Sequence, residues 1–60
     1  MEMTNKTIEG KILVADDDAS TRELLARALI TKGFRVKTAT NGTEALEKIQ
    51  NEYFDLLITV

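Results

Sequence analysis

Apolar positions fall into two unbroken runs and one alternating run along the chain. Residues 11–15 (KILVA) and 56–60 (LLITV) are almost wholly apolar, which is typical of strands covered on both faces of a parallel sheet. Residues 34–39 (FRVKTA) instead alternate apolar and polar side chains, as a half-exposed edge strand does. The pattern therefore predicts two central strands and one edge strand.

The first interval between these runs carries helical spacing. From about residue 20 to residue 32, one face collects the apolar side chains of Leu24, Leu25, Ala28 and Leu29. Ser20 and Glu23 fit a capping box at the start of this helix. Gly33 suits the left-handed position that follows a last helical turn.

A second helix is predicted over about residues 43–51, with Thr43 or Gly42 as its cap and an inward face of Ala45, Leu46 and Ile49. The element order is then β-α-β-α-β, which gives an α/β fold with a parallel sheet and right-handed crossovers. We expect residues 1–10 to form a frayed polar tail and residues 11–60 to form the folded domain. A last strand this apolar should not stay at an open edge, so we expect dimerisation to complete the sheet.

Composition narrows the classes of function. The chain has no cysteine and no histidine, which excludes disulfides and an ordinary zinc site. A net charge of −2 without a basic stripe argues against direct contact with nucleic acid. No apolar run approaches the roughly 20 residues of a membrane span, and the polar start lacks the apolar core of a secretory signal. We therefore expect a cytoplasmic protein that binds neither nucleic acid nor membrane.

Three consecutive acids, Asp16, Asp17 and Asp18, follow the first apolar run. The carboxyl end of a parallel strand faces the crevice where α/β proteins bind ligands. Crowded carboxylates with hard oxygen donors suit Mg²⁺, whereas acids before a helix also serve as caps. We expect Asp18, nearest the helix, to act as a cap or to be simply solvated. For Asp16 and Asp17, composition alone leaves both interpretations open.

The remaining conspicuous residues are expected to be structural. Tyr53 and Phe54 precede the last strand and should cover the bottom of the core. Arg22, Arg27 and Lys48 lie at helix positions that are usually solvated.

Four segments together resemble one known family: residues 12–18 (ILVADDD), 33–34 (GF), 39–46 (ATNGTEAL) and 53–59 (YFDLLIT). Their order and spacing are similar to those of CheY-like receiver domains, the response regulators of two-component phosphorelay signalling. The resemblance covers about residues 11–60 and corresponds to the first half of that family's domain. It implies half of a flavodoxin-like, doubly wound parallel sheet, and it places the family's Mg²⁺-binding acidic pair at Asp16 and Asp17.

The chain departs from the family at Val60. In the family, a strand such as D-L-L-I-T is followed by the aspartate that accepts the phosphoryl group, and here the next residue is valine. Valine has no nucleophilic oxygen, so we expect a pseudo-receiver that cannot be phosphorylated at this position. The family's later hydroxyl residue and lysine have no counterpart in these 60 residues. With the acceptor carboxylate missing as a ligand, Mg²⁺ should bind weakly.

Two classes of function follow from this comparison. The first is a non-enzymatic interaction module, a truncated receiver that forms a homodimer through its third strand, with a sensor kinase or another receiver as further candidate partners. The second is a piece of a working receiver that accepts a phosphoryl group when a C-terminal half complements it. An engineered half-domain with no cellular role is a third interpretation.

Overall fold

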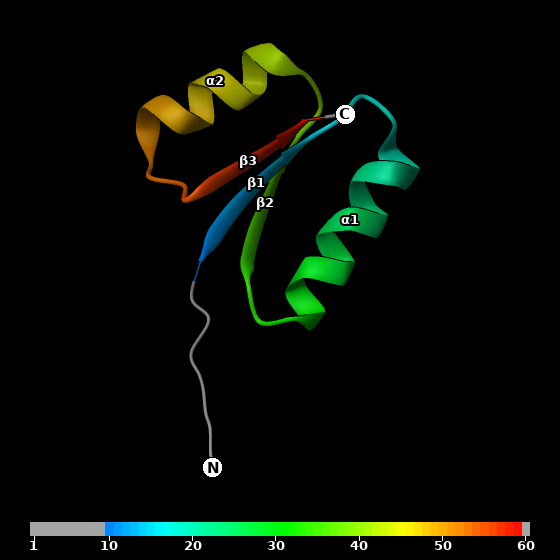
Figure 1. Cartoon of the computed structure of the whole chain (residues 1–60). Helices are drawn as coiled ribbons and strands as arrows, with labels where there is room; N and C mark the ends of the chain where they lie inside the picture. Colours follow the sequence, from blue (N-terminus) through cyan, green and yellow to red (C-terminus); the bar gives the residue numbers. More distant parts are fainter. Residues whose placement is uncertain (1–9, 60) are drawn as a thin grey trace.

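The structure, a computed structural model, describes residues 10–59 and contains five elements in the order β-α-β-α-β (Figure 1). They are β1 (Lys11–Ala15), α1 (Ala19–Thr31), β2 (Arg35–Ala39), α2 (Gly42–Asn51) and β3 (Leu56–Thr59). This order confirms the predicted α/β class. The predicted tail lies outside the described residues except for Gly10, and Val60 lies outside them as well.

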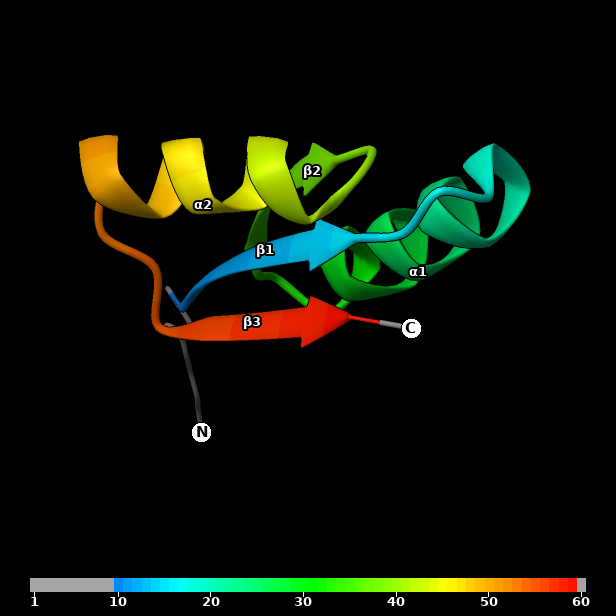
Figure 2. The same ribbon diagram turned by 90° about the horizontal axis from the view of Figure 1, so that it is seen from above.

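All three strands are parallel, and β1 is the middle one in the order β2-β1-β3. Lys11 pairs with Arg35 on one side of β1, and Ile12 pairs with Leu56 on the other. Helix α1 covers one face of the sheet and α2 covers the opposite face, as the two views in Figures 1 and 2 show. This is the three-layer arrangement of a doubly wound α/β fold.

The core lies around β1, where the side chains of residues 12–15 are buried. On the α2 face, Leu13 and Ala15 pack with Ala39 of β2 and Ala45 of α2, and Phe54 packs against this cluster. Tyr53, in contrast, is 74% exposed. The prediction that both aromatic residues cover the core is therefore confirmed for Phe54 and wrong for Tyr53, because neighbouring side chains of extended backbone point to opposite sides.

The prediction that the third strand is covered on both faces is wrong for the described chain. Leu56 is 53% exposed and Leu57 is 41% exposed. Within residues 10–59 both helices lie over β1 and β2 rather than over β3, which forms the free rim of the sheet in Figure 2. Hydrophobic runs report that a segment tends to be buried, but burial also requires a covering layer.

The same geometry explains the exposed apolar residues on the helices. Leu24 of α1 is 70% exposed, while Leu46 and Ile49 of α2 are 56% and 41% exposed. Ala26 and Ile30, on one flank of α1, line a groove together with Thr38 of β2. Because successive helical residues are rotated by about 100°, Leu24 projects from the opposite flank of α1. The predicted inward faces are thus only partly buried.

Both helices begin one residue earlier than predicted. Asp18, not Ser20, caps α1, because its carboxylate accepts from the Ser20 N–H (3.3 Å) and from the Thr21 hydroxyl (2.6 Å). This confirms the expected role of Asp18. Asn41, rather than Thr43 or Gly42, caps α2 by accepting from the Glu44 N–H at 2.8 Å.

The amino end of the sheet is held by polar contacts of Lys11. Its backbone N–H donates to Asp55 Oδ2 and its carbonyl accepts from the Asp55 N–H, both at 2.8 Å. Its ammonium group pairs with Glu52 and lies 5.1 Å from the centre of the Phe54 ring. Glu52 also pairs with Lys37 of β2 at 3.2 Å. These contacts join the segment after α2 to β1 and β2.

Candidate functional site

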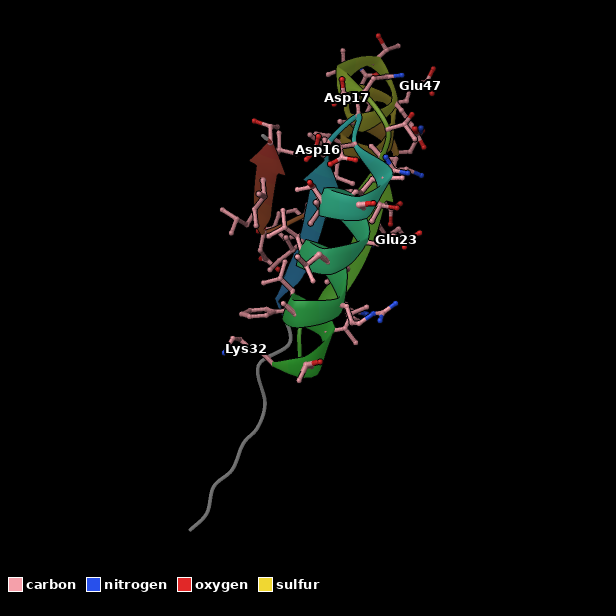
Figure 3. The ribbon with its side chains drawn as sticks, turned by 90° about the vertical axis from the view of Figure 1, so that its right-hand side faces the viewer. Asp16, Asp17, Glu23, Lys32 and Glu47 are labelled. Carbon is pink, nitrogen blue, oxygen red and sulfur yellow. The ribbon has the colours of Figure 1, made fainter. Side chains whose placement is uncertain are left out.

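Asp16 and Asp17 lie at the carboxyl end of β1, where the chain leaves the sheet for α1 (Figure 3). Asp16 is only 7% exposed, whereas Asp17 is exposed. Figure 3 shows the two acids together at this end, with Glu23 farther along α1 and Lys32 at the far end of that helix. Both acids therefore lie at the carboxyl end of β1, and their role as metal ligands stays a prediction.

Backbone hydrogen bonds fix the orientation of Asp16. Its N–H donates to the Ala39 carbonyl at 3.1 Å, which extends the pairing of β1 with β2 by one residue. Its Oδ1 atom accepts from the Asp18 N–H at 3.1 Å and closes a tight turn. No hydrogen bond to Oδ2 is found within residues 10–59. A buried carboxylate with one free oxygen is a polar group that a cation or water can satisfy.

The two acids line a cavity of about 290 Å³ at this edge of the sheet. Its other walls come from the end of β1, the start of α2 and the end of β3, at Ala15, Thr40, Asn41, Gly42 and Thr59. The register pairs Ala15 with Thr59, so β1 and β3 end at the same level. The cavity therefore lies at the carboxyl ends of neighbouring parallel strands, where ligands bind in open α/β sheets.

The neighbouring acids Asp18 and Glu44 serve the helix starts instead. The Thr21 hydroxyl, which donates to Asp18, holds the pKa of that carboxyl below its ordinary value. The Thr40 N–H and then its hydroxyl, which both donate to Glu44, lower the pKa of the Glu44 carboxyl. Because these carboxylates already accept hydrogen bonds, they are poor candidates for metal ligands.

The donor set fits a weakly held hard cation. Asp16 contributes a buried carboxylate whose Oδ2 atom accepts no hydrogen bond from residues 10–59, and Asp17 contributes an exposed carboxylate beside it. Among residues 10–59 no cluster of three or more Asp, Glu, His or Cys side chains could hold a metal ion. Mg²⁺ is commonly bound through one or two carboxylates with several retained waters, so the pair suffices for binding without making it tight.

Arg22 is a part of this site that the sequence analysis missed. It was expected to be solvated, but it is half-buried and its Nη1 donates to the Asp16 carbonyl at 2.7 Å. The arginine lies four residues after the Asp18 cap, which places it one helical turn along α1. That spacing is a signal, but it becomes meaningful only once the cap is assigned to Asp18.

No helix in the part of the chain that the structure describes is long and apolar enough to cross a membrane.

Comparison with known proteins gives one consistent result. The family profile described as "Response regulator receiver domain" matches residues 12–59. Among curated proteins, the chain is 46% identical over 51 residues to the transcriptional regulatory protein CpxR homolog of Haemophilus influenzae, covering 85% of this chain and 22% of that protein. It is 48% identical over 48 residues to the sensor protein EvgS of Escherichia coli, covering 80% of this chain and 4% of that protein.

A third relative is the response regulator receiver protein CpdR of Brucella abortus, 43% identical over 49 residues, with 82% of this chain and 41% of that protein covered. The chain thus spans less than half the length of these curated relatives. No solved structure matches the chain significantly.

Proposed function

Because the chain belongs to the response regulator receiver domains of two-component signalling, we propose that it acts as a non-enzymatic interaction module of such a system. In this proposal it pairs with a second copy through β3, keeps a weak Mg²⁺ site at Asp16 and Asp17, and takes no phosphoryl group at position 60. The observation that carries the proposal is that, among residues 10–59, the apolar strand β3 has no neighbouring strand on its outer edge. The proposal further includes a cytoplasmic location and a sensor kinase as a partner, and the family membership is what supports them.

The loss of phosphorylation rests on the identity of one residue. Val60 follows the D-L-L-I-T segment at the position where the family has its acceptor aspartate. An acyl phosphate requires a carboxylate oxygen, which valine lacks. After incubation with acetyl phosphate and Mg²⁺, the mass of the protein should not increase by that of a phosphoryl group. The variant Val60→Asp should show little or no phosphoryl turnover. A phosphoryl group mapped to the wild-type chain would contradict this part of the proposal.

The proposed Mg²⁺ site rests on the burial of Asp16 and on the cavity that Asp16 and Asp17 line together. Bound there, Mg²⁺ would neutralise the two adjacent carboxylates. Calorimetric titration should show weak binding to the wild-type chain and a clear loss for Asp17→Asn. Glu23→Gln removes the same charge on α1, away from the pair, and should leave the affinity unchanged (Figure 3). Equal losses in both variants would indicate nonspecific attraction to acidic charge.

The backbone geometry of β3 suits a symmetric pair. The Asp55 N–H donates to the Lys11 carbonyl of β1, and alternate residues of a strand point their backbone groups to the same side. Leu56 and Ile58 therefore direct their N–H and C=O groups toward the free edge. Two antiparallel copies centred on Leu57 would pair Leu56 of one with Ile58 of the other and extend the sheet to six strands.

The side chains around this edge are compatible with such a pair. Centring on Leu57 puts Asp55 opposite Thr59 of the second copy, so no like charges face each other. On the α2 face, Ile49, Phe54 and Leu57 contribute to a groove of about 210 Å³. A two-fold axis would bring both copies of this groove to one face of the extended sheet, and two-fold dimers are the commonest oligomers.

Sedimentation at micromolar concentration tests the pairing. The wild-type chain should sediment as a dimer and Leu57→Glu as a monomer, because a carboxylate would then face its copy across the axis. The control is Ile30→Glu, since Ile30 is 56% exposed on the α1 flank beside β2 and should not affect the dimer. A folded wild-type monomer would overturn the proposed partner and would favour a C-terminal receiver half as the occupant of this edge.

A further inference from the structure

Within residues 10–59, Asp16 takes part in three hydrogen bonds, and in only one of them is the partner group a side chain. The Asp16 N–H and the Oδ1 atom bond to backbone groups of Ala39 and Asp18, both at 3.1 Å. The Asp16 carbonyl accepts from Arg22 Nη1 at 2.7 Å. A substitution can remove this third bond without changing the backbone of β1 or the cap of α1.

The bonded carbonyl determines the direction in which the chain continues. The Asp16 carbonyl and the Asp17 N–H belong to one planar peptide unit. A guanidinium that holds this carbonyl therefore fixes the plane from which Asp17 departs, and with it the relative placement of the two carboxylates. The backbone of Arg22 is itself anchored, because its N–H donates to the Asp18 carbonyl at 2.9 Å.

From these contacts we propose that Arg22 is a positioning residue of the acidic site, which orients Asp16 and Asp17 toward their shared cavity. The inference rests on the proposed Mg²⁺ function of that pair. Arg22 would not contact the metal ion. It would act through the Asp16–Asp17 peptide, in the way that groups behind a metal's direct ligands orient those ligands.

The positive charge of Arg22 and its hydrogen bond to the Asp16 carbonyl should have opposite effects on Mg²⁺ affinity, so an experiment can tell them apart. A guanidinium near the acids repels a divalent cation, so removing the charge alone should tighten Mg²⁺ binding. Removing the hydrogen bond should weaken binding, because the two carboxylates lose their fixed placement. The proposal requires the second effect to dominate.

Calorimetric titration of Mg²⁺ into the full chain separates the two effects. Arg22→Met should weaken Mg²⁺ binding about tenfold, the lower end of what loss of such an orienting group costs. Arg22→Lys keeps the charge but lacks the planar donor fork, and it should also weaken binding. Arg27→Met removes one cation from an exposed position of the same helix and should change the affinity less than about twofold. Tighter binding by Arg22→Met would show that Arg22 acts only as a charge, and the proposal would be wrong.

Amide hydrogen exchange without metal provides a second readout. The Asp18 N–H, which donates to Asp16 Oδ1, should exchange faster in Arg22→Met and Arg22→Lys and at the wild-type rate in Arg27→Met. If the wild-type chain binds no Mg²⁺, the metal proposal fails, but this exchange comparison still decides the role of Arg22. Unchanged exchange in both Arg22 variants would overturn the proposal. Should Arg22→Met fail to fold, as judged by circular dichroism, Arg22→Lys decides on both readouts.

Discussion

Replacement of Leu13 by alanine tests the core most directly. Leu13 is fully buried at 0% exposure in the middle of the central strand. Three of its packing partners are alanines, at positions 15, 39 and 45. Alanine has no side-chain rotamers with which to move into the vacated space, so most of the cavity should remain. We therefore expect a cost toward the upper part of the usual range, about 3–5 kcal/mol.

That cost is large relative to the total stability of so short a chain. A domain of 60 residues at roughly 0.05–0.15 kcal/mol per residue has about 3–9 kcal/mol of unfolding free energy. The variant Leu13→Ala should thus be largely unfolded already without urea, so that circular dichroism at 25 °C shows little of the cooperative urea transition of the wild-type chain. The matched control is Leu24→Ala, the same chemical change at a side chain that is 70% exposed, with an expected cost below about 0.5 kcal/mol.

The two variants must be compared at one protein concentration, because a dimer makes the unfolding midpoint depend on concentration. A loss below about 1 kcal/mol for Leu13→Ala would refute the packing argument. An equal loss for Leu24→Ala would show instead that a partner covers this flank of α1.

Two further predictions concern acid stability and the glycines. Hydrogen bonds from Lys11 and then from Lys37 lower the pKa of Glu52 in the folded state below its ordinary value of 4.5. The ionised Glu52 side chain therefore makes its full contribution to the free energy of unfolding above pH 4.5, and this contribution is lost as the pH falls through the lowered folded-state pKa. Urea midpoints should therefore decline below about pH 4.5, and Glu52→Gln should flatten that decline; an unchanged acid limb would contradict the assignment. Gly33 has φ of 102°, so Gly33→Ala should lower the unfolding free energy by about 1–2 kcal/mol, while Gly42→Ala, with open space around its Cβ position, should be neutral or slightly stabilising in the same urea assay. Equal effects of the two alanines would refute the role of the left-handed conformation.

The order of elements could be predicted from the sequence because it depends on local patterns. Unbroken runs gave β1 and β3, alternation gave the edge strand β2, and Gly33 marked the end of α1. The cap of α1 could not be assigned from the sequence, because Asp18 and Ser20 are both good cap residues only two positions apart. Backbone conformation decides between them, and Asp18 has the extended φ and ψ of a cap.

The acidic pair could be placed from its position after β1, but the environment of the pair could not. Asp16 and Asp17 lie at the predicted edge, with Asp16 buried and Asp17 exposed. The contact of Arg22 with the Asp16 carbonyl depends on the exact turn of α1 above the sheet, which no local pattern encodes. Likewise, the exposure of Leu56 and Leu57 reflects where the helices lie and not the hydrophobicity of β3.

The middle position of β1 has a consequence for synthesis on the ribosome. The first strand to emerge is the one that ends up between two neighbours, and both neighbours are made later. The apolar residues 12–15 of β1 therefore stay exposed to solvent until residue 39 has left the exit tunnel and β2 can pair with β1. The other edge of β1 stays unpaired until residue 59 has left the tunnel and β3 can pair with it. A nascent chain of this kind is exposed to chaperones and to aggregation until both neighbours of β1 have been made.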